Sequence, residues 1–385
     1  MRILYHHRTL GDGAEGIHIA EMVNAFRSLG HEVLLIGPAV SGSLSQQTGS
    51  RLHMGVKRFL RGPFYEMLEI GYNLYGFHSV CRAIEKFKPA FIYDRYITFN
   101  YSCIAAAQKK KIPVFLEVNA PLAYERDHEA DENLCFRRLA YSVERLTCKG
   151  ASRTVAVSST LKDYLVSVGV PAQQILVLPN GVNTTKFYQR EKSDELLQSL
   201  GLDESNTLIG FVGILRPWHG VDILLQAFRI VHVVFPKAIL LLVGDGPIRS
   251  QIESLARELG IGQSLRITGR VPHEKVGEYI ALFDVAVSPK ATFYASPMKI
   301  IEYMAQGKAI VAPDMANVKD LVDDGVNGLL FQSGSAEALA ATLIAALSDD
   351  NLRIKLGKAA LIETSRRLNW PANASRVIKE YERLI

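Results

Sequence analysis

Apolar segments of strand length alternate with amphipathic helical segments along this 385-residue chain, and this alternation constrains the fold more than any other feature. Residues 2–6 and 32–36 have the pattern of buried strands, and residues 17–29 between them have that of a helix ending at Gly30. Two such strands joined by a helix form a parallel βαβ unit. Further strands in the first half are expected at residues 91–93, 114–118 and 155–158.

The alternation starts again in the second half, after a polar, charged stretch at residues 191–206. Strands are expected there at residues 208–213, 238–243, 265–268 and 284–289, and a final helix at residues 369–384. A chain of this length with 48% apolar residues can bury two cores. We therefore expect an α/β protein with two Rossmann-like, doubly wound parallel sheets, in domains 1–185 and 186–362, followed by a C-terminal helical segment, 363–385.

Composition excludes several classes of protein. The longest apolar run, residues 238–243, is far shorter than the roughly 20 residues of a membrane span, and no secretory signal pattern follows Arg2. The four cysteines form no C-x-x-C pair, which is typical of reduced thiols. We expect a soluble, cytoplasmic protein. The formal charge of +5 suits anionic small molecules or an acidic membrane surface and is too small to indicate nucleic acid.

Residues 11–16 read G-D-G-A-E-G, which matches the G-x-G-x-x-G pattern of dinucleotide-binding proteins. Two other parts of that pattern are missing. The glycines begin several residues after the strand, and Gly37 and Pro38 follow the second strand where a ribose-binding acid is required. NAD and FAD are therefore disfavoured. The charged run 124–129 lines an acceptor cleft or coats a helix, and without a second ligand cluster it predicts no metal site. We expect no cofactor.

The segment 283–308 contains a short strand, a loop and a helix whose two ends are well marked. Ser296 is expected to cap the helix, Pro297 to occupy its first position and Gly307 to end it. These signals place the helix start at the end of the loop.

Lys299 lies in the first turn of this helix, where the helix dipole disfavours a cation unless an anion binds. Glu302 lies one turn further along on the same side. The pattern fits a phosphate at the helix start with a carboxylate nearby for hydroxyl groups. A solvated Lys299–Glu302 pair on a crossover helix fits the same spacing.

The sequence S-P-x-K-x-x-E-Y-M-A-x-G-K in this segment resembles the donor-binding segment of the large family of retaining glycosyltransferases with the GT-B fold. That family includes many bacterial polysaccharide and glycolipid enzymes. The glycine-rich first loop and the P-N-G-V sequence at 179–182 extend the resemblance over nearly the full length. It implies two domains that face a cleft, a donor bound mainly by the second domain, an acceptor bound mainly by the first, and a last helix that crosses back.

The resemblance also implies roles for individual residues. Arg216 and Lys299 would contact the donor diphosphate, and Glu302, matching the second of two family glutamates, would hold the ribose; these three are the expected catalytic residues. Tyr294 stands where the first glutamate is expected, near the transferred sugar. Ile214 and His219 occupy the usual arginine and lysine places of the diphosphate loop.

Further contacts implied by the resemblance involve the diphosphate (Gly13, Gly16, His219, Met298), the nucleobase (Arg270, Val271) and the sugar (Asn119, Tyr294, Ser296). For Asn119, a plain turn before Pro121 is the alternative, and for His219 a packing or capping role.

Residues 52–61 mix basic and apolar side chains, and Phe64, Tyr65 and Met67 follow closely. They form either a surface helix with solvated charges or a patch that contacts an anionic membrane near a lipid-linked acceptor.

Together with these patterns, the resemblance implies a metal-independent, retaining hexosyltransferase that uses a UDP- or GDP-sugar and a glycan or lipid-linked acceptor. It would be cytoplasmic or peripheral on the inner membrane face. Two alternatives remain open. One is a noncatalytic nucleotide-sugar-binding partner of a polysaccharide assembly complex, which Tyr294 in the glutamate position suggests. The other is a sugar-nucleotide 2-epimerase on the same fold.

Overall fold

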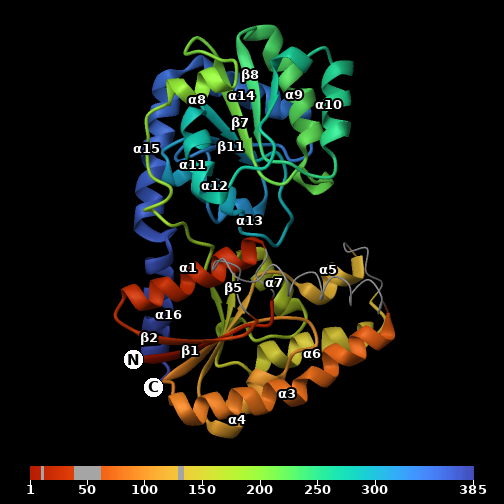
Figure 1. The fold of residues 1–385 in the computed structure, drawn as a ribbon, viewed down its shortest axis with the longest axis vertical. Coiled ribbons are helices and arrows are strands. Elements are labelled where there is room, and N and C mark those ends of the chain that lie inside the picture. The colour runs from red at the N-terminus through yellow and green to blue at the C-terminus, as the bar shows by residue number, and fades with distance from the viewer. Residues whose placement is uncertain (10–12, 39–61, 129–133) are drawn as a thin grey trace. The chain divides into compact units, whose positions relative to one another are not determined.

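The protein is described here from a computed structural model, which covers residues 1–9, 13–38, 62–128 and 134–385 (Figure 1). The chain forms two compact units. One contains residues 1–179 together with 370–385, and the other contains residues 180–369. The chain returns to the first unit immediately before its last helix, α16 (Trp370–Glu382), which packs on α1 (Ala14–Ser28).

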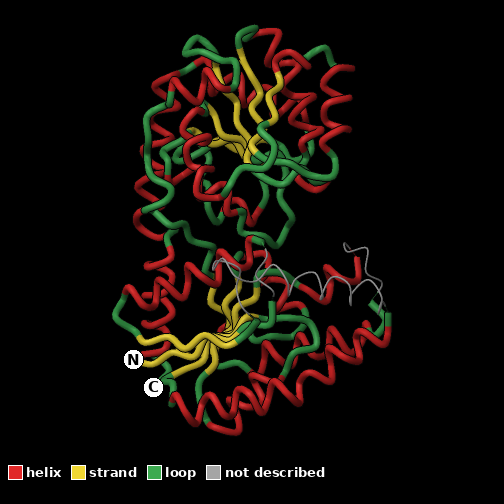
Figure 2. The backbone as a smooth tube through the Cα atoms, in the orientation of Figure 1, coloured by secondary structure: helices red, strands yellow, loops and turns green. Residues whose placement is uncertain are grey.

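The first unit has a six-stranded parallel sheet in the order β2-β1-β3-β4-β5-β6. Helices lie on both of its faces (Figure 2). Its strands are β1 (Arg2–His6), β2 (Glu32–Ile36), β3 (Phe91–Arg95), β4 (Val114–Val118), β5 (Arg153–Ala156) and β6 (Ile175–Val177). Its other helices are α3 (Pro63–Phe87), α4 (Ser102–Lys110), α5 (Leu122–His128), α6 (Arg137–Gly150) and α7 (Ser159–Ser167).

The second unit also has a six-stranded parallel sheet, in the order β12-β11-β10-β7-β8-β9. Its strands are β7 (Thr207–Val212), β8 (Ala238–Val243), β9 (Leu265–Ile267), β10 (Val285–Val287), β11 (Ala309–Pro313) and β12 (Leu329–Phe331). Its helices are α8 (Asp194–Ser199), α9 (Val221–Val234), α10 (Arg249–Glu258), α11 (His273–Leu282), α12 (Met298–Ala305), α13 (Ala316–Lys319), α14 (Ala336–Ser348) and α15 (Asp350–Arg367). The predicted fold class, two doubly wound parallel sheets, is confirmed.

Strand β8 shows why the residue pattern of the sequence predicts these sheets. Ile239, Leu241 and Val243 pack into the core on one face of the sheet, and Leu240 and Leu242 into the core on the other. A strand covered on both faces is continuously apolar, and helices fill both sides. Strand β5 lies two residues before its predicted position, because Ser158 instead caps α7 by accepting a hydrogen bond from the Leu161 amide.

Both sheets contain a point where the strand order reverses direction. In the first unit this point lies between β1 and β3, and in the second between β7 and β10. Loops from such a neighbouring pair leave the sheet toward opposite faces, so a crevice opens at the carboxyl ends of the two strands. Each unit therefore has one expected ligand position: the loops after β1 and β3, and the loops after β7 and β10.

Helix α12 follows the loop after β10 and is held firmly against the second sheet. The buried hydroxyl of Tyr303 accepts a hydrogen bond from the Val212 amide, 2.8 Å away, at the end of β7. Just beyond the C-terminal end of α12, Gly357 of α15 lies against Gly307. A Cβ atom on Gly357 would come 2.0 Å from the Gly307 carbonyl oxygen. The position of α12 thus depends on a glycine in α15.

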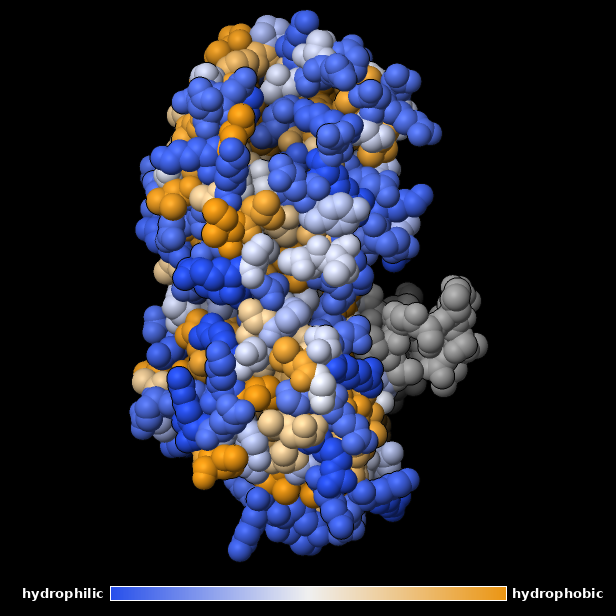
Figure 3. Space-filling model, turned by 90° about the vertical axis from the view of Figure 1, so that its left-hand side faces the viewer, coloured by the Kyte–Doolittle hydropathy of each residue, from blue (hydrophilic) through white to orange (hydrophobic). Residues whose placement is uncertain are grey.

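Within the described residues, no helix combines the length and the apolar character that a membrane crossing requires. Figure 3 shows one face of the protein, on which hydrophobic residues are interspersed among hydrophilic ones, as is usual for protein surfaces.

Replacing Gly357 by Ala should lower the free energy of unfolding by about 1–3 kcal/mol, because the methyl group overlaps backbone atoms of Gly307 that cannot move independently. The matched control is Gly71→Ala in α3, where no atom lies within 4 Å of the added Cβ. This control should raise stability by about 0.5–1 kcal/mol through helix propensity. Urea denaturation measures both, and equal effects of the two substitutions would contradict the proposed contact.

Candidate functional site

The loop after β7 carries Arg216 and His219 and is shaped by close backbone contacts. The Leu215 amide donates to the Asp245 carbonyl oxygen at 2.9 Å, and a short 3₁₀ turn, Pro217–His219, follows. Gly220 ends this turn with φ 68°, a left-handed conformation that favours glycine, and its backbone lies against Lys290 of the loop after β10. The loops after β7 and β10 therefore meet, as the reversal of strand order predicts.

The loop after β10 is held by polar contacts that differ from the predicted ones. The Asn317 side chain donates to the carbonyl oxygens of Thr292 and Ala295. Ser296 does not cap α12. Its hydroxyl accepts from the Asn180 amide at 3.0 Å, and its carbonyl oxygen accepts from the Asn180 side chain at 2.9 Å.

The predicted helix cap is therefore wrong: Pro297 and not Ser296 is the cap residue, and the Ser296 hydroxyl is bonded to Asn180. Pro297 is the residue before the helix rather than its first residue. The described residues provide no side-chain cap and no acid in the first turn of α12. Met298 and Lys299 begin this uncapped turn.

Lys299 projects back from α12 toward β7. Its Nζ atom lies 4.3 Å from the centre of the Phe211 ring and is buried, and no described group accepts a hydrogen bond from it. A Cβ atom on Gly213 would come within 3.3 Å of it, so the glycine leaves this space open. Burial lowers the pKa of Lys299 to about 8, although the nearby Glu302 opposes the shift. An ammonium is thus held in a low-dielectric position without a hydrogen-bonding anion.

His219 lies beside the same lysine. Its Nδ1 donates to the Ile214 carbonyl oxygen, 2.5 Å away, so Nε2 carries a lone pair in the neutral ring. Burial, together with the nearby charges of Lys299 and Arg216, lowers its pKa to about 4. His219 is therefore neutral near pH 7 and adds a positive charge only after taking up a proton. Arg216 is exposed and lies 4.9 Å from the Trp218 ring centre.

Glu302 is buried one turn into α12, with 7% of its surface exposed. The Nε2 atom of His273, the first residue of α11, lies 3.4 Å from Glu302 Oε1. His273 follows the loop that contains Arg270, which is exposed, and Val271, which packs partly against the core. The structure thus brings the predicted nucleobase loop to the predicted ribose-binding carboxylate.

Tyr294 is buried, with 6% exposure, and its ring contacts that of Phe293 at 5.1 Å between centres. It belongs to the loop before α12, as predicted, but its aromatic ring offers no carboxylate there. Its contact with a transferred sugar stays a prediction.

The predicted residues of the first unit lie near the carboxyl edge of its sheet. Gly13 precedes α1 and Gly16 lies in its first turn, where the Gly16 amide donates to the Gly13 carbonyl oxygen at 3.0 Å. Asn119 follows β4, and its side-chain amide donates to Glu117 Oε1 at 2.5 Å. Ligand contacts of all three stay predictions.

Glu117 is the centre of a buried charged group that sequence reasoning missed. Arg95 Nη1 lies 3.0 Å and His18 Nδ1 2.7 Å from Glu117 Oε1. Burial raises the pKa of Glu117, but His18, Arg95 and the hydrogen bond from Asn119 outweigh it and hold the pKa at about 2. Glu117 is therefore a carboxylate at any ordinary pH. An acid within an otherwise apolar strand was the available signal.

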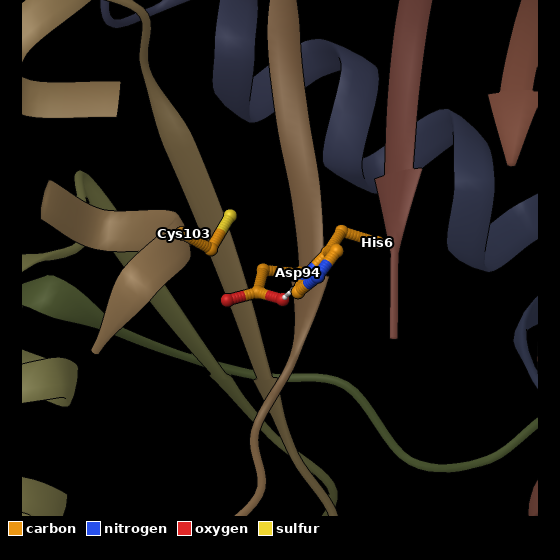
Figure 4. Close-up of side chains that lie close together, drawn as sticks. All are labelled: His6, Asp94 and Cys103. Atoms are coloured by element: carbon orange, nitrogen blue, oxygen red, sulfur yellow. Dashed lines mark hydrogen bonds and ion pairs between the residues drawn. The ribbon is translucent and has the colours of Figure 1, made fainter. Parts of the chain in front are cut away.

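His6, Asp94 and Cys103 form another buried group, at the ends of β1 and β3 and the start of α4 (Figure 4). Among the described residues this group has ligand atoms close enough to hold a metal ion, all within 4.8 Å of one another. His6 Nδ1 and Asp94 Oδ1 are 2.6 Å apart, shorter than the about 3.3 Å between two ligands of a tetrahedral zinc ion. Burial raises the pKa of the Cys103 thiol, and Asp94 raises it further. The group is therefore a hydrogen-bonded His–Asp pair beside a protonated thiol.

In a comparison with known proteins, both halves of the chain match glycosyltransferase family models. Residues 192–362 match the family model described as glycosyl transferases group 1, and residues 15–186 match that of Glycosyltransferase Family 4. A glycosyltransferase of Methanocaldococcus jannaschii is 24% identical over 245 residues, which are 63% of this chain and 62% of that protein, less than two thirds of its length. The D-inositol 3-phosphate glycosyltransferase of Thermomonospora curvata is 24% identical over 390 residues, 96% of this chain and 90% of that one.

Solved structures agree on the fold. Anabaena Alr3699/HepE in complex with UDP superposes with a TM-score of 0.76 over 100% of both chains at 19% identity. The lipopolysaccharide outer core galactosyltransferase WaaB superposes with a TM-score of 0.68 over 99% of both chains at 16% identity. Because the two family models match consecutive halves and the fold agrees along the whole length, the chain belongs to the family 4-like glycosyltransferases with the GT-B fold.

Proposed function

We propose that this protein transfers a hexose from a UDP- or GDP-sugar to a glycan or lipid-linked acceptor, with retention of configuration and without a metal ion. The observation that carries the proposal is the buried ammonium of Lys299, which no described acceptor contacts, beside the uncapped start of α12. Lowering its pKa from 10.5 to about 8 corresponds to about 3 kcal/mol against the charged form. A bound diphosphate would remove that cost.

The same position suits a leaving group. As the bond between the anomeric carbon and the diphosphate oxygen breaks, negative charge grows on that oxygen. Lys299, Arg216 and the free amides of Met298 and Lys299 would stabilise it. The acceptor oxygen bonds to the anomeric carbon on the same face, and its proton passes to the departing diphosphate. These groups supply the charge that a metal ion provides in other transferases.

Other predicted residues take supporting roles in this proposal. Glu302, steadied by His273, accepts hydrogen bonds from the ribose hydroxyls, and the backbone at Arg270 and Val271 contacts the base. Gly13, Gly16 and Asn119 serve the donor and acceptor from the first unit, while Tyr294 and Ser296 lie near the sugar. His219 joins the diphosphate site only when protonated. A UDP complex is known for the Anabaena neighbour, which supports the choice of a nucleotide donor here.

A membrane location remains a prediction. The basic segment, residues 52–61, lies outside the described residues. Helix α3, which follows it, has charged residues within positions 63–78 at Glu66, which is buried, and Glu69, which pairs with Arg126. Apart from His78, the exposed side chains there are apolar or aromatic, and such a face suits contact with a bilayer that carries a lipid-linked acceptor. They are Phe64, Met67, Leu68, Tyr72, Leu74 and Tyr75.

The proposed reaction predicts slow hydrolysis of one UDP- or GDP-hexose by the purified protein, releasing nucleoside diphosphate and free hexose. A thermal-shift screen of nucleotide sugars selects the donor, since ligands that bind only the folded state raise its melting temperature.

Lys299→Met should lower turnover by about 100-fold. Binding without cleavage would support the noncatalytic alternative, and recovery of an intact nucleotide sugar inverted at carbon 2 would support the epimerase.

Replacing Glu302 by Ala should weaken donor binding by about 10- to 100-fold, because hydrogen bonds to a charged group contribute about 1.5–3 kcal/mol. Isothermal titration calorimetry with the selected nucleotide sugar measures this loss. Glu278→Ala, an exposed substitution on α11, is the matched control and should bind normally. Unchanged affinity in the Glu302 variant would remove this residue from the proposed site.

Donor affinity should fall as the pH rises above about 8, with a slope approaching tenfold per unit. The reason is that the free protein loses the Lys299 proton there while the complex retains it. The Lys299→Arg variant should lack this fall, because a guanidinium stays charged throughout. Affinities between pH 7.5 and 9.5 test the prediction, and parallel curves for the two proteins would contradict it.

A further inference from the structure

The loop directly after β1 lies at the strand reversal of the first sheet, the position where that sheet is expected to bind a ligand. Arg8 is the cation of this loop. Its guanidinium carbon lies 4.0 Å from the ring centre of Tyr72, on α3, and its Nη2 atom donates weakly to the Glu69 carbonyl oxygen at 3.5 Å. The side chain is therefore held in one place.

Arg8 nevertheless lacks a counter-ion of its own among the described residues. The two carboxylates that act on it electrostatically are Glu69 and Asp94. Glu69 is paired with Arg126 at 3.0 Å, and Asp94 with His6 at 2.6 Å. The Nη1 atom of Arg8 is buried and makes no hydrogen bond to a described group.

Neighbouring atoms show what could share a ligand with Arg8. The hydroxyl of Thr9, the next residue, is also buried without a described partner. The Nε2 atom of His7 is likewise unpartnered, but the backbone of Gly37 packs against it, since a Cβ atom on Gly37 would lie 2.6 Å away. The Gly37 backbone therefore blocks a ligand from reaching the Nε2 atom of His7. Burial lowers the pKa of Arg8, which agrees with a guanidinium whose charge is poorly compensated.

We propose that Arg8 forms an oxyanion subsite in the first unit, and that this subsite takes an anionic group of the acceptor. The planar guanidinium matches the two oxygens of a phosphate ester or of a sugar carboxylate. That the anion belongs to the acceptor rests on the proposed function. The anion site itself does not.

The experiment uses the full chain with Lys299→Met as background, so that the diphosphate site of the second unit responds less. Melting temperatures are measured in sodium phosphate, sodium acetate and sodium chloride at equal ionic strength. Phosphate or acetate should raise the melting temperature by at least about 2 °C above chloride. The more effective of the two identifies the class of anion.

Arg8→Met, which keeps a long side chain against Tyr72, should abolish this increment, and Arg8→Lys should keep part of it. In chloride, Arg8→Met should be no less stable than its parent, since it removes a buried, uncompensated charge. Arg27→Met, at an exposed arginine of the same unit, is the control and should keep the full increment. An increment that survives Arg8→Met, or none in the parent, would overturn the proposal. The increment could depend on Arg8 while the unsubstituted protein binds no nucleotide sugar. That result would support the anion subsite and contradict the proposed function.

Discussion

The structure of the candidate site depends on one unfavourable arrangement, a buried lysine ammonium held without an accepting group beside a helix start of the same sign. Desolvation of the Lys299 charge and its position at the positive end of the α12 dipole both act against it. Such an arrangement persists only when the surrounding structure holds it in place. Here Tyr303 fixes α12 to β7, Gly357 lets α15 pack against its end, and Ser296 is engaged by Asn180 rather than by the helix amides.

The two units share one electrostatic feature at the same position of their topology. Each has a parallel sheet with one reversal of strand order, and each presents a poorly compensated cation close to that reversal. These cations are Lys299, in the first turn of α12, and Arg8, in the loop after β1. Nearby carboxylates exist in both cases. Glu302 lies one turn from Lys299 without forming an ion pair with it, and Glu69 and Asp94 are occupied by Arg126 and His6. The distribution of partners, more than the number of charges, leaves each cation available to a ligand.

Two histidines of the second unit show how the surroundings change the chemistry that a residue type suggests. His219 replaces the usual lysine of the diphosphate loop, yet its Nδ1 is committed to the Ile214 carbonyl and its pKa is lowered, so it presents a lone pair instead of a charge. His273, which no sequence motif marked, lies against Glu302 and restricts one of its oxygens. The site therefore has fewer permanent cations and a better oriented carboxylate than its sequence suggests.

The sequence by itself determined the two doubly wound sheets, because strands buried on both faces must be apolar throughout. It marked Lys299 and Glu302 through local spacing, and Arg216 through the resemblance to the glycosyltransferase family. It misplaced the role of Ser296, and it did not show Arg8, Glu117 or His273 as members of polar groups. Helix caps and the apolar pattern of strands depend on residues that are close in the chain, so the sequence shows them directly. Whether a hydroxyl, a carboxylate or a guanidinium already has a partner depends on residues dozens of positions away, such as Asn180 for Ser296 and Arg126 for Glu69. Only the tertiary structure decides which charges remain uncompensated.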